Sequence, residues 1–451
     1  MKKLGSKKQI ALYAVSGMGV NLLNTMMTSY LCSALIIGGF GEAAIKNQTY
    51  LQRDLVDAAI WGAFVLIAKI IDGIIDVPMA ALTDGLRSRF GRRRPSLLIG
   101  LIPLLLAYAA FLIVPRPEGV SLLNTFYYGV VLCIFYTCYT LTMVTYYATF
   151  TEIVSTERER TMLGNVKSVC DIVYFIIGYV GVRAMLNGMN VRVAALIVMP
   201  LSLTMLIPLF MIKEPSNKDV PKEKTKRLRL VPSLAATLKN GSFIKWMIVY
   251  SFMTFGVQLF LGGINEYFSF VKMNMIYVMM AAFAPVPLTL LLYNKIHRRY
   301  GFGVSYGYIL TVFFTGTVTM FFVSFMAEGA AKTVLSIISG LICSFAIGAL
   351  FAVAYSVPSQ LAAEEEERTG VSNSAMYFAV QGLFSGVATG IGTGVVLTAL
   401  KKSSEGVADI HAGTAPIAYM TLICAAAMAV SLIFTFFLPK SIKLLGKEQG
   451  K

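Results

Sequence analysis

Long apolar runs separated by short polar loops recur along the whole chain. Each run has about 20 residues, the length that a helix needs to cross a bilayer. Backbone groups in hydrocarbon must satisfy their own hydrogen bonds, so runs of this kind predict helices. We predict twelve spans, at residues 9–37, 57–83, 96–114, 122–150, 164–186, 191–212, 244–265, 273–294, 304–326, 333–360, 371–400 and 416–438.

The longest polar stretch, Lys213–Leu238, divides these spans into two sets of six. It contains three prolines and the basic run Lys222–Arg229. We predict an N-terminal six-helix bundle at 1–212, a cytoplasmic linker at 213–243 and a C-terminal six-helix bundle at 244–451. A solvated linker near anionic headgroups explains the basic run, and a regulatory partner site is the alternative.

The two halves repeat in sequence. Tyr147–Arg160 forms the end of the fourth span and the loop after it, and Tyr355–Arg368 does the same for the tenth, with the same length from tyrosine to arginine. The loop Arg87–Arg92 after the second span resembles His297–Phe302 after the eighth. Two parallel six-helix repeats are typical of transporters, with the substrate site between the halves near the bilayer midplane. We therefore expect an all-α membrane fold of two pseudo-symmetric bundles.

Composition and charge agree with a membrane protein. Apolar residues make up 57% of the chain and charged residues 14%, whereas soluble proteins carry about 25% charged residues. The net charge of +16 lies mainly in alternate loops, such as Met1–Lys8, Gly85–Pro95 and Lys295–Gly303. This positive-inside pattern predicts that both termini are cytoplasmic and argues against nucleic acid as a partner. The basic start leads into the first span without a small-residue cleavage site, so we expect that span to be retained.

No pattern in the sequence indicates an enzyme. The six cysteines fall inside predicted spans without metal-type spacing, and the two histidines, His297 and His411, lie in loops. We find no nucleophile elbow and no phosphate-binding loop, so we expect no catalytic residues, no metal site and no cofactor apart from a coupling ion.

The second span carries Lys69, Asp72 and Asp76 within an apolar run. Each would cost roughly 2.5–3.5 kcal/mol at the centre of a lone helix. Their spacings of three and four residues place all three on one helical face. Two carboxylates one turn apart repel unless a cation or a proton lies between them. We therefore interpret the three residues as a cation-coupling site, with a structural salt bridge as the alternative.

Further polar residues inside spans are candidates for substrate binding. Lys167 and Asp171 are four residues apart and can pair on one face of the fifth span. The alternative for such residues is hydrogen bonding between helices, and Asn265 with Glu266 suggests a rim or gate near the outer face. The substrate-binding candidates are Asn21, Tyr146, Lys167, Asp171, Gln258 and Gln381.

Arginines in the short inner loops are candidates for an inward gate. They would hold that gate closed by pairing with Asp84 and with acidic residues of Glu364–Glu367. The alternative is that these basic loops determine topology alone. The gating candidates are Arg87, Arg89, Arg92 and Arg368.

The second span and its loop resemble a known family. Asp72-x-x-x-Asp76, Pro78 and the loop Asp84–Pro95 are similar to the signature of the glycoside–pentoside–hexuronide:cation symporters, such as melibiose permease, in the major facilitator superfamily. The Glu157–Thr161 loop is also similar. The resemblance implies a twelve-helix major facilitator fold, a cation bound at Asp72 and Asp76, and Lys69 in the place of a basic residue of the family.

The chain also departs from that family. Val144 stands where relatives carry an acidic residue on the fourth helix, and Gly386 stands near the place of their lysine on the eleventh. The first-helix aspartate is replaced within Ser16–Asn21, while Lys167 lies near an arginine that contacts substrate in relatives. Sodium-coupled lysolipid symporters carry a similar second-span motif. These departures favour protons over sodium as the coupling ion.

We predict a secondary active transporter in the plasma membrane, working by alternating access as a monomer among membrane lipids. It would carry a small polar solute (a sugar, a glycoside or a sugar acid) together with H+ or Na+. One alternative is an exporter or exchanger of amphipathic compounds or lysolipids, which the apolar stretches Met247–Phe260 and Met273–Met280 would suit. Another alternative is a membrane receptor, although the chain has no large soluble domain.

Overall fold

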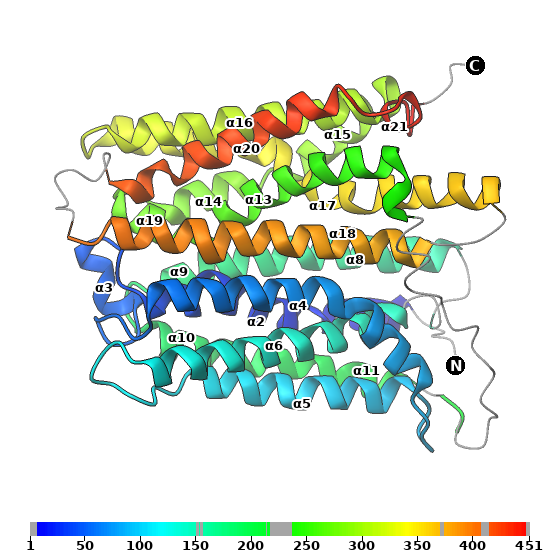
Figure 1. Ribbon diagram of the computed structural model, residues 1–451, viewed down its shortest axis with the longest axis horizontal. Helices are drawn as coiled ribbons and strands as arrows, with labels where there is room; N and C mark the ends of the chain where they lie inside the picture. Colours follow the sequence, from blue (N-terminus) through cyan, green and yellow to red (C-terminus); the bar gives the residue numbers. More distant parts are fainter. Residues whose placement is uncertain are drawn as a thin grey trace. The chain divides into compact units, whose positions relative to one another are not determined.

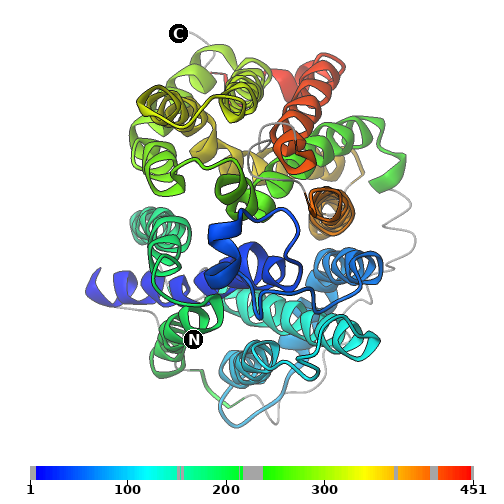
Figure 2. The same ribbon diagram turned by 90° about the vertical axis from the view of Figure 1, so that its left-hand side faces the viewer.

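The structure is a computed structural model and describes residues 7–149, 153, 157–212, 214–216, 237–369, 374–406 and 415–447. Within these ranges every regular element is a helix. Within each unit the long helices run side by side (Figure 1), and the view turned by 90° shows many helices end-on (Figure 2). The expected all-α class is confirmed.

The chain divides into two compact units. The N-terminal unit holds Met1–Ile37 and Ile45–Thr225, and the C-terminal unit holds Lys226–Lys451 together with Gly38–Ala44. The sequence analysis grouped Gly38–Ala44 with the N-terminal bundle, so this short segment belongs to a different unit from the residues on both sides of it.

Among its described residues, the N-terminal unit contains six helical stretches and one short helix, α3 (Glu42–Gln48), which begins within Gly38–Ala44. Three of these stretches are single unbroken α-helices, and the other three change helix type along their length. In order they are α1 (Lys7–Ser16), α2 (Met18–Met26), η1 (Met27–Leu31) and η2 (Ser33–Leu35); α4 (Ala58–Gly85); α5 (Arg93–Phe111); α6 (Leu122–Ala148); α8 (Glu157–Ile176), η3 (Ile177–Gly181) and α9 (Val182–Met185); α10 (Val191–Val198), η4 (Met199–Leu206) and α11 (Ile207–Met211).

The C-terminal unit has a matching series of helices. Its longest helix extends well beyond the predicted tenth span. In order the elements are α13 (Gly241–Phe270); α14 (Met275–Phe283) and α15 (Val286–Tyr300); α16 (Phe302–Ser324); α17 (Ala330–Thr369); α18 (Ser374–Gly390), η5 (Ile391–Val396) and α19 (Leu397–Ser403); η7 (Pro416–Tyr419) and α20 (Met420–Thr435); and α21 (Lys440–Lys443).

Ten helices of the described chain are long and apolar enough to span a membrane, or eleven if α14 and α15, which bend by 42°, form one span. Twelve were expected. The remaining predicted span, 164–186, is helical as α8, η3 and α9 but carries Lys167, Asp171 and Arg183. The second span carries as many charged residues within α4, at Lys69, Asp72 and Asp76.

Polar residues at the predicted loop edges begin several helices. Asp57 accepts a hydrogen bond from the backbone N of Ile60 (2.9 Å), and Ser121 accepts one from Asn124 (3.1 Å). Side-chain acceptors at this position satisfy amide groups that the first helical turn leaves free. Residues next to each other in the sequence therefore determine where these helices start, independently of packing between helices.

Two π-helical turns of the N-terminal unit lie against each other. η1 and η3 are joined by Ser29 Oγ and Tyr179 Oη at 3.2 Å, and Tyr30 Oη donates to the carbonyl of Gly178 at 2.8 Å. A π-helical turn inside an α-helix marks a local departure from the ordinary hydrogen-bond ladder and is frequent at functional sites.

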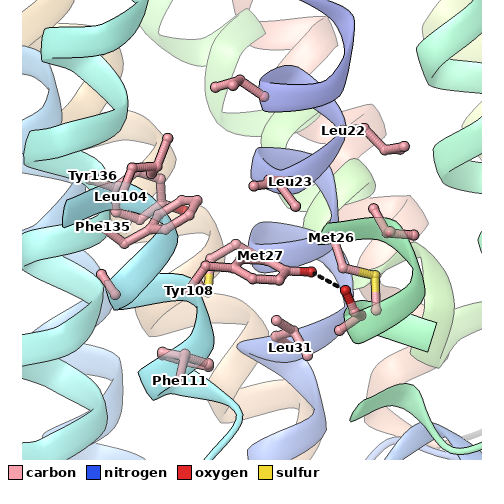
Figure 3. Close-up of a cluster of buried hydrophobic side chains, with 14 of the residues drawn as sticks. Leu22, Leu23, Met26, Met27, Leu31, Leu104, Tyr108, Phe111, Phe135 and Tyr136 are labelled. Carbon is pink, nitrogen blue, oxygen red and sulfur yellow. Dashed lines mark hydrogen bonds between the residues drawn. The ribbon is translucent and has the colours of Figure 1, made fainter. Parts of the chain in front are cut away.

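The core of the N-terminal unit lies between α2, η1, α5 and α6. Leu23, Met27 and Tyr108 are among its fully buried side chains. Figure 3 shows these side chains packed between the helices, with the Tyr108 hydroxyl bonded across to the carbonyl of Ala195 (3.2 Å). This apolar core fixes the helices that carry the polar residues of the next section.

Candidate functional site

The charged residues of the second span meet side chains of α6. On α4, Lys69 Nζ lies 3.7 Å from Asp72 Oδ2 and 3.7 Å from the centroid of the Tyr136 ring. The Lys69 side chain is 10% exposed and that of Asp72 is 28% exposed. The ammonium group is therefore held between a carboxylate and an aromatic face, both of which stabilise a buried cation.

Hydroxyl and amide groups extend this pair into a polar network over three helical stretches. Thr140 Oγ1 donates to Asp72 Oδ1 (2.8 Å), Tyr136 Oη bonds Thr28 Oγ1 (3.0 Å), and Tyr139 Oη donates to Asn21 Oδ1 (3.0 Å). We call Lys69, Asp72, Thr140, Tyr136, Thr28, Tyr139 and Asn21 the polar network. It connects the first, second and fourth spans inside the N-terminal unit.

Asp76 lies one helical turn beyond Asp72 and has an exposed side chain. Among the described side chains, none forms a hydrogen bond or an ion pair with it. A carboxylate in this position can take up a proton or a metal cation without breaking an existing contact. The second span thus carries one carboxylate that is bonded to Lys69 and Thr140, that of Asp72, and one turn away the carboxylate of Asp76 without such a contact among the described side chains.

Lys167 and Asp171 form a second ion pair, on α8. The Lys167 side chain is 9% exposed, and its Nζ lies 5.6 Å from the centroid of the Tyr147 ring. Asp171 is 39% exposed. The pair has the predicted spacing, and its role in substrate binding stays a prediction.

The other substrate candidates are placed differently. Tyr146 is fully buried and donates to the carbonyls of Tyr13 (2.9 Å) and Ala14 (3.0 Å), so in this structure it fastens α6 to α1 and offers no surface to a solute. In the C-terminal unit, buried Gln381 accepts a hydrogen bond from Trp246 Nε1 (2.8 Å), while Gln258 is half-buried on α13.

The loop after α4 contacts a carboxylate that the sequence analysis missed. Glu214 Oε2 accepts a hydrogen bond from the backbone N of Arg93 (2.7 Å), at the first residue of α5. Arg93 itself is 4% exposed, and its guanidinium lies 3.4 Å from Thr83 Oγ1. A carboxylate at a helix N-terminus accepts hydrogen bonds from backbone amides that have no partner within the helix. Its negative charge also interacts favourably with the positive end of the helix dipole.

The gating role of the arginines stays a prediction. Arg87 and Arg89 are exposed, and Arg92 is half-buried. The guanidinium carbon of Arg89 lies 4.7 Å from the centroid of the neighbouring Phe90 ring. Two of the expected acidic partners accept hydrogen bonds within the C-terminal unit, Glu364 from Gln360 (3.0 Å) and Glu365 from Tyr377. The side chains of Asp84 and Arg368 lie outside the described residues.

A buried ion pair in the C-terminal unit was also missed. Lys401 Nζ lies 2.8 Å from Glu266 Oε1, with side-chain exposures of 3% and 0%. The sequence analysis placed Glu266 at an outer rim but did not select Lys401. The two residues are 135 positions apart, so only a prediction of which helices pack together could have paired them.

Comparisons with known proteins agree with this architecture. A family model described as MFS/sugar transport protein matches residues 12–443. An uncharacterized symporter of Synechocystis sp. is 36% identical over 139 residues, which are 28% of this chain and 26% of that relative's length.

Solved structures resemble the chain over almost its whole length. The nucleoside transporter NupG has a TM-score of 0.62 at 17% identity, with 97% of this chain and 100% of that chain covered. A bacterial homolog of the human lysosomal transporter Spinster has a TM-score of 0.60 at 11% identity, covering 97% and 99%. At these identities the likeness concerns the fold alone.

Proposed function

The chain belongs to the MFS/sugar transport protein family and is a transporter rather than an enzyme, and we propose that it couples the movement of a small polar solute to that of a cation. Solute and ion would enter from the same side and leave together by alternating access. The proposal is supported chiefly by the ion pair of Lys69 and Asp72 inside a membrane span, with Asp76 one turn away.

The coupling step follows from charge balance. A proton or a cation that arrives at Asp76 or Asp72 competes with Lys69 for the carboxylates. Lys69, Asp72 and Asp76 carry one net negative charge without the ion and none with it, so the network would have two arrangements. One is stable without the ion and the other with it. Moving one charge down a membrane potential of 100 mV would release about 2.3 kcal/mol to drive the solute.

We favour a proton as the coupling ion. A proton needs a single carboxylate oxygen, which the exposed Asp76 offers. A sodium ion needs several oxygen ligands at once, whereas both oxygens of Asp72 already face Thr140 and Lys69. The relative that is named a symporter supports coupled transport without indicating the ion.

The solute would bind beside the polar network. Asn21 and Tyr139 offer an amide and a hydroxyl, and such groups recognise the hydroxyls of sugars, glycosides and sugar acids. A thermal-shift panel of sugars, sugar acids, nucleosides and amphiphiles, with and without sodium, would identify the class. A true ligand raises the melting temperature by mass action, and a panel in which only amphiphiles stabilise the protein would contradict a polar solute.

Uptake into proteoliposomes then tests coupling directly. With the stabilising solute supplied in radiolabelled form, we expect accumulation under an imposed inward pH gradient and none without a gradient. Replacing Asp72 by Asn removes the carboxylate, and Glu405→Gln, on an exposed carboxylate that pairs with Lys402, serves as the matched control. Equal uptake with and without ion gradients would make the protein a facilitator.

We further propose that the protein lies in the plasma membrane as a monomer, with both termini in the cytoplasm. The concentration of Lys and Arg in alternate loops supports the cytoplasmic placement of the termini. Fluorescent reporters that mature only in the cytoplasm, fused to either end, should both light up. A dark C-terminal fusion beside a bright N-terminal one would contradict the even number of spans.

A further inference from the structure

The C-terminal unit contains a completely buried ion pair at the ends of two helices. Glu266 lies near the end of α13, and Lys401 lies in α19. Their charged atoms are 2.8 Å apart, and neither side chain is more than 3% exposed. Burying two charges carries a desolvation cost that hydrophobic residues of similar size would avoid. The pair therefore calls for a role beyond stability.

The surroundings of the pair leave polar atoms unsatisfied. Glu266 Oε2 and both amide atoms of Asn265 are buried without a hydrogen-bond partner among the described residues. Each such atom destabilises the buried arrangement relative to one that water can reach. The unsatisfied atoms therefore favour an arrangement in which water reaches Asn265 and Glu266 over the buried one.

The segment Gly38–Ala44, which we call the strap, covers this pair. Lys401 Nζ lies 4.5 Å from the centroid of the Phe40 ring, and Phe40 is 4% exposed. The backbone N of Gly41 approaches Ser269 Oγ to 3.4 Å, one helical turn after Glu266. The strap thus contacts both helices that carry the ion pair.

Glycines allow the strap to lie this close. A Cβ atom at Gly38 would be 2.3 Å from the carbonyl oxygen of Lys401, and one at Gly41 would be 2.5 Å from that of Ser269. Both neighbours are backbone atoms and cannot turn aside. The backbone of the strap is therefore fitted to the helix ends and does not merely pass over them.

We propose that the strap is a latch that closes over Glu266 and Lys401 and must detach before solution can reach them. Phe40 stabilises the latched state through the lysine ammonium, while the unsatisfied atoms of Asn265 and Glu266 favour the open state. The residues before and after the strap belong to the other unit. Detachment of the strap would therefore accompany the opening of the transporter on this side.

This inference rests on the chain being a transporter and is independent of its solute and ion. The test uses the full chain in lipid nanodiscs, where both faces are accessible. Ser269→Cys places a thiol under the strap, and a membrane-impermeant maleimide reports how often it is reached. The chain with its native cysteines alone gives the background, and Glu118→Cys, on an exposed outer loop, gives the rate for an open site.

We expect Ser269→Cys to react much more slowly than Glu118→Cys. Adding Phe40→Ala removes the ring over Lys401 and should raise the rate at position 269 by about fivefold, with no change at position 118. Gly41→Ala should raise it as well, because its Cβ atom cannot fit against Ser269. This second variant gives an independent result should Phe40→Ala fail to fold.

Two results would overturn the latch. One is rapid labelling of Ser269→Cys under the native strap, at the rate of Glu118→Cys. The other is a labelling rate at position 269 that neither Phe40→Ala nor Gly41→Ala changes. Neither readout requires substrate or an ion gradient, so failure of the latch would be distinct from failure of the proposed symport.

Discussion

At the scale of single residues, the coupling candidate depends on neighbours from another helix. The spacing of Lys69 and Asp72 within one span predicts that they pair, and the structure places them 3.7 Å apart. The spacing says nothing of Thr140 or Tyr136, because these come from α6. Likewise, Tyr146 lies in a polar stretch of sequence, yet its hydroxyl donates hydrogen bonds to backbone carbonyls of α1. Local pattern identifies polar residues in a span but not the direction they face.

Thr140→Val tests the link between α6 and Asp72. The change removes a hydroxyl that donates to the carboxylate and keeps the shape of the side chain. A hydrogen bond to a charged group contributes about 1.5–3 kcal/mol, so we expect gradient-driven uptake to fall about tenfold or more. Thr137→Val is the matched control, since among the described residues the Thr137 hydroxyl bonds only the carbonyl of Cys133 in its own helix. Identical uptake by the two variants would remove Thr140 from the site.

At the scale of elements, the sequence predicts helix positions well and helix interruptions poorly. Runs of apolar residues locate the spans, and residues such as Asp57 and Ser121 mark their starts. The π-helical turns η1 and η3 leave no comparable trace in the sequence, and the contact between them, from Tyr30 Oη to the carbonyl of Gly178, joins residues 148 positions apart. The role of Glu214 was missed for the same reason, since it lies 121 residues from Arg93.

Gly91→Ala tests the packing of the loop after α4 on Glu214. Gly91 has a φ of +81°, where a side chain costs roughly 1–2 kcal/mol. Its Cβ atom would also lie 2.3 Å from Glu214 Cβ. We expect a clear drop in the melting temperature of the purified protein. Gly188→Ala, which meets nothing within 4 Å, should leave that temperature nearly unchanged, and equal losses in the two variants would rule out the close contact.

At the scale of the whole molecule, the sequence predicts class, span pattern and family, since these depend on composition, periodicity and a local motif. The comparisons confirm the transporter family across residues 12–443. The sequence predicts neither the pair of Glu266 and Lys401 nor the placement of Gly38–Ala44 in the C-terminal unit, because both arise from contacts far apart along the chain. Long-range pairing of polar groups is set by helix packing, which hydropathy does not encode.

The most direct test of coupling separates accumulation from exchange. Asp72→Asn and Asp76→Asn together would be measured in proteoliposomes for uptake against a gradient and for counterflow of the same labelled solute. We predict that accumulation is lost, because no carboxylate remains to take the ion, while counterflow continues because the solute still binds. Undiminished ion-driven accumulation by this double variant would contradict coupling at these carboxylates.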